Sequence, residues 1–367
     1  MFLTNPFPGA FGLDIGDLAI KLVLLSRHRR LGRGSYFKIE EVRSTSLPPG
    51  LIVNGEIEQP EIVRKKILHL LGRDGSSKPI KSSWVVADLP EPKTFLKLIE
   101  IELPEKELLY EDVAYFAKKH VPFELEETYL DWQVMDSLEA RNRTVQVLIA
   151  AVPKIIADSY TYLLESVGLT PLAFEIEAMP LARTLITHTK DYTGQARVIL
   201  DLGATRSSFV VYDFDRIQFS TNLDFSGELV TTAISQGLKI DHEAAEKLKI
   251  KNGLEYDKEQ PRYLKMVSDL VEGLIEEIKK NLSFYKEHFR ETNPITHITM
   301  SGGLAELKNL DVVLSQKLRI PAQTGNAWKN IGNFAPTAKD LGAGLSYASA
   351  IGLAMRAASN PFKENTL

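Results

Sequence analysis

The most regular hydrophobic pattern in the chain is an apolar strand, a tight polar turn and a second apolar strand, and it occurs twice. The copies cover residues 11–25 (FGLDIGDLAIKLVLL) and 197–212 (RVILDLGATRSSFVVY). In each copy an Asp-x-Gly tripeptide, at residues 14–16 or 201–203, ends the first apolar run. One such turn alone is typical of an ordinary β-hairpin. Because the copies lie about half the chain apart in matching contexts, the sequence predicts two related domains with one such hairpin each.

Between the two copies, hydrophobic periodicity predicts a mixed sheet with crossover helices. After a basic turn at residues 27–34, we expect strands at residues 36–44, 84–87 and 171–175. Apolar residues at helical spacing predict helices over residues 59–71 and 178–185.

Residues 90–168 have the pattern of a separate module. Expected strands cover residues 94–101, 128–136 and 144–151, and expected helices cover residues 105–119 and 154–167. Gly168 is placed to end the second helix as a C-cap. The order β-α-β-β-α predicts a small open-faced α+β subdomain inserted in the first domain.

The second half continues the α/β pattern. We expect strands at residues 216–223 and 297–301, and helices at 227–238, 241–249, 262–290 and 342–358. The long third helix has an apolar stripe formed by Leu264, Val267, Val271, Leu274, Ile278, Leu282, Tyr285 and Phe289. The predicted division is a first domain of residues 1–89 and 169–195 with a C-terminal helical segment at 338–358, the insert at 90–168, and a second domain at 196–337 whose helical part is about 226–292.

Composition excludes several classes of protein. The chain has a net charge of −4, so it carries no basic field that would attract nucleic acid, and it has no cysteine for disulfides or thiol catalysis. There is no Walker A, GxGxxG or Gly-x-Ser-x-Gly motif, and no pair of histidines at helical metal-ligand spacing. No apolar run has transmembrane length, and residues 1–12 lack the features of a signal peptide.

The remaining chemistry is that of a nucleotide site. Asp14 and Asp201 are placed to hold Mg²⁺ through water, because Mg²⁺ keeps most of its hydration shell. The turn amides of Gly16 and of residues 203–205 are candidates to cradle phosphate. The predicted cofactor-binding residues are Asp14, Gly16, Asp17, Lys21, Asp201, Gly203, Ala204, Thr205, Glu246, Lys249, Gly302, Gly303 and Leu304.

Two parts of this set have simpler alternatives. Gly302 and Gly303 follow an apolar strand, and backbone without side chains would let a flat purine lie against it. The alternative is a strand-to-helix turn. Glu246 and Lys249, three apart on a helix, share a face and could reach a ribose; the alternative is an exposed ion pair that contributes little.

These segments resemble the actin–Hsp70–FtsA ATPase superfamily, and further segments narrow the resemblance to the PilM family of type IV pilus assembly. It covers residues 11–358, and its most specific parts are Val-Pro-Phe at 121–123 and Leu-Asp-Trp-Gln at 130–133 in the insert. The resemblance implies an α/β, actin-like two-domain fold with a nucleotide cleft and an inserted α+β subdomain. It also implies ATP and Mg²⁺ as cofactors.

The resemblance further implies a partner and a location. The expected partner is the N-terminal cytoplasmic tail of a PilN-type inner-membrane protein, held in a groove between the first domain and the insert. The chain would be cytoplasmic and peripheral to the inner membrane through that partner, with self-association and no membrane insertion of its own. For the groove we nominate Phe116, Val121, Phe123 and Trp132, whose alternative role is the insert's own core.

Two acidic residues bear on activity. Glu177 matches the glutamate that faces Mg²⁺ or the attacking water in the superfamily, and it is the candidate catalytic residue. Asp17 departs from the family, which usually has Ser or Thr after Asp-x-Gly. A carboxylate ~4 Å from a phosphate charge costs on the order of 4 kcal/mol at an effective dielectric constant of 20. The alternatives are therefore a nucleotide-free scaffold and an active ATPase or small-molecule kinase of the same superfamily.

Overall fold

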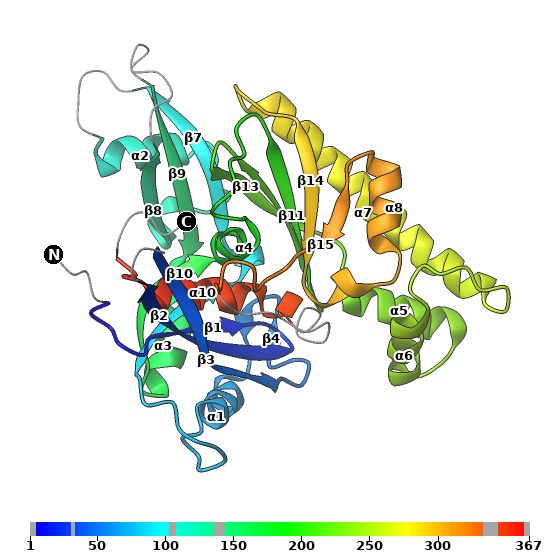
Figure 1. Cartoon of the computed structure of the whole chain (residues 1–367), viewed down its shortest axis with the longest axis horizontal. Coiled ribbons are helices and arrows are strands. Elements are labelled where there is room, and N and C mark those ends of the chain that lie inside the picture. Colours follow the sequence, from blue (N-terminus) through cyan, green and yellow to red (C-terminus); the bar gives the residue numbers. More distant parts are fainter. Residues whose placement is uncertain (1–4, 31–33, 103–107, 136–143, 333–343, 363–367) are drawn as a thin grey trace. The chain divides into compact units, whose positions relative to one another are not determined.

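A computed structural model describes residues 5–30, 34–102, 108–135, 144–332 and 344–362. Contacts between residues divide the chain into two compact units (Figure 1). Unit 1 contains residues 1–180, 217–221 and 349–367, and unit 2 contains residues 181–216 and 222–348. The predicted insert at 90–168 lies inside unit 1, whereas residues 181–195 are grouped with unit 2. No helix in the described part of the chain is long and apolar enough to span a bilayer.

The main sheet of unit 1 has five strands in the order β10-β6-β1-β2-β3. Its members are β1 (Phe11–Ile15), β2 (Ala19–Arg30), β3 (Gly34–Ser46), β6 (Trp84–Leu89) and β10 (Thr170–Ile176). β1 pairs antiparallel with β2 and parallel with β6, so the first predicted hairpin lies at the centre of the sheet. A small separate hairpin is formed by β4 (Ile52–Val53) and β5 (Glu56–Ile57).

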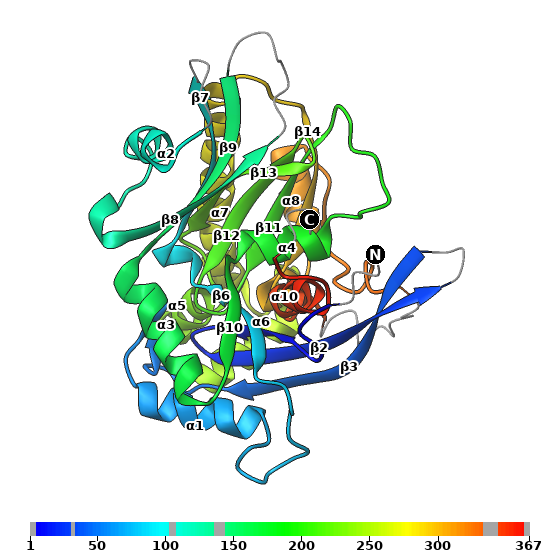
Figure 2. The ribbon, with the colours of Figure 1, turned by 90° about the vertical axis from the view of Figure 1, so that its left-hand side faces the viewer.

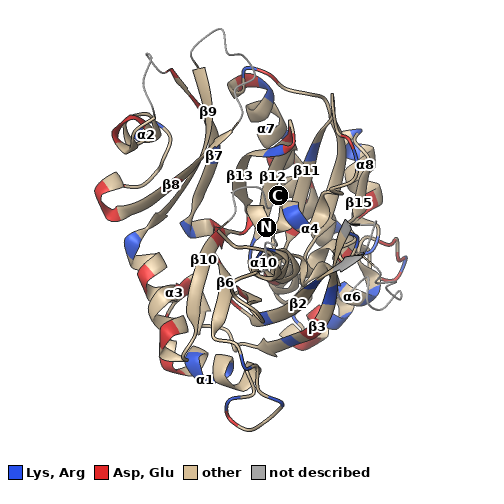
Figure 3. Cartoon of the chain, turned by 60° about the vertical axis from the view of Figure 1, so that its left-hand side comes forward, with Lys and Arg blue, Asp and Glu red and all other residues tan. Residues whose placement is uncertain are grey.

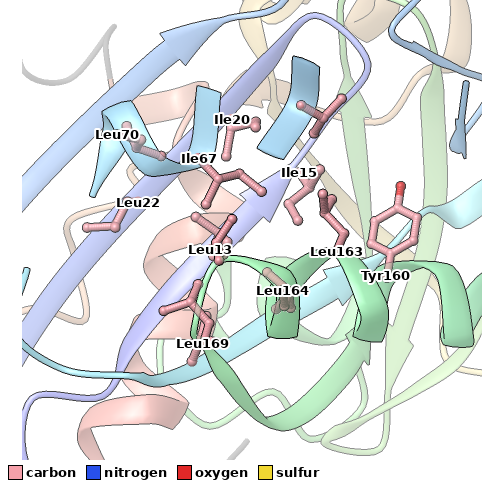
Figure 4. Close-up of a cluster of buried hydrophobic side chains, with 14 of the residues drawn as sticks. Leu13, Ile15, Ile20, Leu22, Ile67, Leu70, Tyr160, Leu163, Leu164 and Leu169 are labelled. Atoms are coloured by element: carbon pink, nitrogen blue, oxygen red, sulfur yellow. The ribbon is translucent and has the colours of Figure 1, made fainter. Parts of the chain in front are cut away.

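The core of unit 1 lies between this sheet and helices α1 (Pro60–Leu70) and α3 (Lys154–Ser166) (Figure 4). Buried side chains from the sheet meet buried side chains from both helices; they include Leu13, Ile15, Ile20, Leu22, Ile67, Leu70, Tyr160, Leu163 and Leu164. Helix α10 (Ala348–Ala358) covers β1 at Gly12, where an added Cβ would lie 2.5 Å from the Ala350 carbonyl oxygen.

Residues 90–168 form a small sheet with its own helix. Strands β7 (Phe95–Glu102), β8 (Thr128–Met135) and β9 (Thr144–Pro153) pair antiparallel in the order β7-β9-β8. The remaining elements are the 3-10 turns η1 (Glu91–Lys93) and η2 (Leu125–Glu127) and helix α2 (Tyr110–Ala117). The predicted order β-α-β-β-α is confirmed. Helix α2 has acidic residues and no basic one, whereas α1 and α3 have both (Figure 3).

Unit 2 has a sheet segment in the order β15-β14-β11-β12. Its strands are β11 (Ala196–Leu202), β12 (Ser207–Asp213), β14 (Ile295–Ser301) and β15 (Ala322–Thr324). The strand that follows β12 along the chain, β13 (Arg216–Leu223), has its residues 217–221 grouped with unit 1. The helices are α4 (Ala178–Leu185), α5 (Gly227–Leu238), α6 (His242–Asn252), α7 (Pro261–His288) and α8 (Leu310–Leu318), with η3 (Gly303–Glu306) after β14. The stripe of α7 is buried at Val267, Val271, Leu274, Ile278 and Tyr285, whereas Leu264, Leu282 and Phe289 are half-buried.

Three sequence predictions are wrong in detail. The turn expected at residues 27–34 is shorter, because β2 continues to Arg30 and β3 begins at Gly34 (Figure 2). Helix α2 begins at Tyr110, where the Asp112 carboxylate accepts the Leu109 amide, and it ends at Ala117. The helix expected from residue 342 is interrupted by a turn at residues 346–347 before α10. Parts of three predicted segments lie outside the described residues: 105–107 of the helix at 105–119, 136 of the strand at 128–136, and 338–343 of the C-terminal segment.

Candidate nucleotide-binding site

The two Asp-x-Gly hairpins have the same construction. The Gly16 amide donates to the Ala19 carbonyl at 3.0 Å, and the Gly203 amide donates to the Arg206 carbonyl at 2.9 Å. Each hairpin therefore has a two-residue loop, 17–18 or 204–205. This corrects one expectation, because both glycine amides are used inside the hairpin and do not point outward to a phosphate.

In unit 1, Asp14 is buried at the end of β1 with a cation beside it. Lys21 lies opposite Asp14 in the β1–β2 register, and its Nζ is 3.1 Å from Asp14 Oδ2. Asp14 Oδ1 has no hydrogen-bond partner within the described ranges. The neighbouring Ile15 amide donates to Asp88 Oδ1 at 3.3 Å. The hairpin thus presents one carboxylate oxygen together with a lysine.

Asp17 is buried, with 6% of its surface exposed, and its carboxylate faces the β4–β5 hairpin. Its oxygens accept the amides of Asn54 and Gly55, each at 3.2 Å. Both of these turn residues have positive φ, 50° and 78°, which orients their successive amides toward one acceptor. The carboxylate is therefore held toward the β4–β5 turn by backbone donors, whose dipoles offset part of its negative charge.

In unit 2, the corresponding Asp201 lies between two strands. Ser301 on β14 is its register partner, and the Ser301 hydroxyl donates to Asp201 Oδ1 at 2.6 Å. The loop beyond it is fixed on the start of α5: the Gly227 amide donates to the Gly203 carbonyl at 3.0 Å, and the Glu228 amide donates to the Ala204 carbonyl at 2.7 Å. The first amides of α5 therefore hold the second hairpin, with Ala204 and Thr205 at its tip.

Glu246 and Lys249 on α6 do not form the exposed ion pair of the simpler alternative. Lys249 is buried, and its Nζ lies 2.6 Å from Glu246 Oε2, 2.8 Å from Thr231 Oγ1 and 3.1 Å from the Gly227 carbonyl oxygen. Burial acts to raise the pKa of Glu246, but hydrogen bonds from Lys249 and Thr231 outweigh it and lower that pKa below its ordinary value. Lys249 is therefore enclosed by protein acceptors, and Glu246 is the half-exposed member of the pair.

Gly302 and Gly303 differ in what surrounds them. Gly302 has a φ of +82°, and an added Cβ would lie 2.3 Å from the Leu202 carbonyl oxygen, so only glycine fits against β11. At Gly303 an added Cβ would meet no heavy atom of the described chain within 4 Å. Leu304 is buried, with 6% of its surface exposed. Gly303 therefore provides the open backbone that a flat ligand needs.

The other nominated residues lie in unit 1. Glu177 is half-buried between β10 and α4, with Oε1 3.5 Å from the Ser349 hydroxyl. Val121 is buried in the core of the insert, and Phe116, Phe123 and Trp132 are half-buried and pack against that core. The four groove candidates thus contribute to the insert's core, and the three aromatic residues also keep some exposed surface.

Residues 12–358 match the family described as type IV pilus assembly protein PilM. The chain belongs to the PilM family. It is similar to the chain solved as "PilM-PilN type IV pilus biogenesis complex", with a TM-score of 0.81 and 24% identity over 96% of this chain and 100% of that chain.

More distant structures have the same overall architecture. MreB 5 of Spiroplasma citri bound to AMPPNP has a TM-score of 0.53 and 12% identity, covering 94% of each chain. The ethanolamine utilization protein EutJ from Carboxydothermus hydrogenoformans has a TM-score of 0.50 and 14% identity, covering 96% of this chain and 92% of that chain. At these identities the likeness shows the fold alone, and it is an actin-like fold.

Sequence reasoning missed several residues that shape the site of this PilM-family chain. Thr231 has no motif of its own, and its contact with Lys249 depends on how α5 packs on α6. The Asn54–Gly55 turn had a signal, because Asn-Gly between two short segments with strand-forming residues is a strong hairpin pattern. Nothing local in the sequence connects that turn to Asp17, which lies 37 residues from Asn54.

Proposed function

We propose that this chain is the ATP-binding component of a type IV pilus or related secretion platform. It binds ATP with Mg²⁺ through residues of both units and docks the N-terminal tail of a PilN-type inner-membrane protein. It works on the cytoplasmic side and stays at the membrane through that partner. The shared construction of the two hairpins carries this proposal, because each ends in an aspartate and a two-residue loop fixed by the same hydrogen bond.

Nucleotide binding is supported by distant relatives as well as by geometry. The two MreB 5 structures of Spiroplasma citri, with TM-scores of 0.51 and 0.53, are described as bound to ADP and to AMPPNP. In this chain, ATP phosphates would meet the loops at 17–18 and 204–205, and the purine would lie along Gly303. Glu246, held by Lys249 and Thr231, would face the ribose.

The carboxylates fit a hydrated magnesium ion. No group of three or more His, Asp or Glu residues that could ligate a metal occurs in the part of the chain that the structure describes. Asp14 Oδ1 and the Asp201 carboxylate would therefore accept hydrogen bonds from waters of the ion, which Mg²⁺ retains readily. The ion would supply positive charge to the phosphates.

The partner assignment rests on the family and on the related complex, whose description names PilN. The half-buried Phe116, Phe123 and Trp132 stay candidates for contact with the tail. Self-association stays a prediction as well. Glu177 is the candidate residue for orienting a hydrolytic water, and turnover would at most be weak. The nucleotide-free scaffold stays the alternative, and titration with Mg-ATP separates it from the proposal.

The proposal is tested by adding a side chain where the ligand should lie. Gly303→Val places a branched side chain into space that is open in the protein, so folding is preserved and the purine is obstructed. We expect Mg-ATP affinity, measured by isothermal titration calorimetry, to fall at least about tenfold, which corresponds to about 1.4 kcal/mol.

The matched control is Gly273→Val on α7, where an added Cβ also meets open space. It should leave the affinity unchanged. Equal Mg-ATP affinity in Gly303→Val and Gly273→Val, with unaltered thermal unfolding in both, would remove Gly303 from the site. Absence of Mg-ATP binding by the wild-type protein would reject the nucleotide part of the proposal.

A further inference from the structure

Arg197, near the start of β11, is a buried cation without a hydrogen-bonded partner. Only 7% of its surface is exposed. Its guanidinium carbon lies 4.3 Å from the centre of the Tyr192 ring. Its Nε donates to no acceptor, and no carboxylate pairs with it among the residues that the structure describes. A buried guanidinium N–H without an acceptor is costly, so this group is suited to an anion from outside the chain.

Three more basic groups lie around Arg197. Lys190 Nζ lies 5.7 Å from the centre of the same Tyr192 ring. His297 on β14 is the register partner of Arg197 on the neighbouring parallel strand. Lys329 is close enough for its charge to be repelled by Arg197 and Lys190, and its Nζ donates to the Leu185 carbonyl. Four basic side chains from three separate segments thus gather in unit 2.

The charges of this cluster repel one another. Burial, followed by repulsion from Arg197 and Lys190, lowers the pKa of Lys329 to about 8 and lowers that of His297 below its ordinary range. At pH 7 the cluster therefore carries the charges of Arg197, Lys190 and Lys329. Tyr212 is the register partner of Arg197 on β12, and burial followed by the negative charge of Asp215 raises its pKa. Asp215 itself is exposed in the β12–β13 turn, and within the described residues it forms no ion pair with the Arg197 guanidinium.

We propose that Lys190, Arg197, His297 and Lys329 form a binding site for a phosphate group. The planar guanidinium matches two phosphate oxygens, and a dianion balances the excess positive charge better than a single carboxylate would. Arg197 precedes Asp201 by four residues on β11, which places the site about 13 Å along the strand from the proposed nucleotide residues. The inference does not depend on the proposed function.

The test is thermal unfolding of the full chain in inorganic phosphate, with sodium chloride at matched ionic strength as the reference. At about five times the dissociation constant, phosphate should raise the unfolding midpoint by roughly 1–2 °C. Arg197→Met should reduce phosphate affinity at least about tenfold. Without phosphate it should unfold at an equal or higher temperature than the wild type, because an unpaired buried charge is removed.

A second variant avoids the core. Lys190 is exposed, so Lys190→Met should fold normally and weaken phosphate binding roughly two- to fivefold. Lys280→Met, at an exposed position of α7, is the charge-matched control and should respond as the wild type does. Gly303→Val should also keep the full phosphate response, which separates this site from the nucleotide residues.

A second arm replaces inorganic phosphate with sn-glycerol 3-phosphate. Stabilisation by both compounds would assign the site to a phosphate carried on a larger molecule, and stabilisation by inorganic phosphate alone would assign it to the free ion. An equal effect of phosphate and chloride on the wild type, or an unchanged phosphate response in Arg197→Met and Lys190→Met, would overturn the inference.

Discussion

At the scale of single residues, Asp17 shows how one contact changes the interpretation of a motif. A carboxylate next to a phosphate loop suggests repulsion of ATP when only the sequence is considered. In the structure, the carboxylate accepts two amides of the β4–β5 turn, and the Gly55 carbonyl in turn accepts the Tyr160 hydroxyl from α3 at 3.1 Å. Asp17 therefore connects the β1–β2 hairpin with the β4–β5 hairpin, which is itself bonded to α3.

This role makes a prediction about stability. Asp17→Ala leaves the part-buried amide of Asn54 and the buried amide of Gly55 without their acceptor, and loss of the acceptor of a buried donor costs about 1–3 kcal/mol. We expect the free energy of unfolding to fall by about 2–4 kcal/mol in chemical denaturation. Asp269→Ala on α7 removes only an exposed partner of Lys265 and should change it by less than about 0.5 kcal/mol. Equal effects of the two substitutions would show that Asp17 anchors nothing.

At the scale of elements, the second hairpin, α5 and α6 form one hydrogen-bonded assembly within unit 2. The start of α5 holds the hairpin tip through the Gly227 and Glu228 amides. The Gly227 carbonyl, on the same turn, accepts the Lys249 ammonium from α6. A ligand that contacts the tip at Ala204 and Thr205 would therefore act directly on α5, and through Lys249 on α6.

The assembly predicts unequal effects for the two members of the α6 ion pair. Lys249→Met removes a buried cation from three oxygens and should lower the free energy of unfolding by about 1–3 kcal/mol. Glu246→Gln keeps a polar, half-exposed group and should cost less. Because the folded pKa of Glu246 is lowered, its contribution is present at neutral pH and is lost as the pH falls through that pKa.

Denaturant titrations at pH 7 and pH 4 measure both effects. Lys247→Met, which breaks the exposed pair with Glu243 on the same helix, is the matched control. If Lys249→Met and Lys247→Met lower the free energy of unfolding equally, Glu246 and Lys249 form an ordinary surface ion pair.

Individual elements show what sequence reasoning could predict. Helix α5 was predicted with the observed bounds, 227–238, and in the structure the Ser226 hydroxyl caps it by accepting the Leu229 amide. The β2–β3 turn was misjudged because Arg27 and its basic neighbours suggest a loop, whereas the backbone continues the ladder to Arg30, with the Arg27 and His28 side chains exposed. The gathering of Lys190 and Arg197 with Lys329 also depends on tertiary packing, because no local pattern joins residues 190–197 to a residue more than 130 positions later.

At the scale of the whole molecule, the chain belongs to the PilM family and has an actin-like fold. The nucleotide ligand and the PilN-type partner are proposals based on that family and fold. Both hairpins were predicted from the repeated Asp-x-Gly pattern and confirmed with the same internal hydrogen bond. The insert's fold was predicted as well, but its aromatic residues could not be divided between core and partner surface, because a half-buried side chain serves either.

The most direct measurement is calorimetric titration of Mg-ATP into the wild-type protein and into Asp17→Ser. Since the Asp17 carboxylate is held by the Asn54 and Gly55 amides, the wild type should bind with a micromolar or lower dissociation constant. Asp17→Ser should bind no more tightly, because it loses the anchor of the β4–β5 turn. Absence of binding by the wild type, together with binding by Asp17→Ser, would contradict this account.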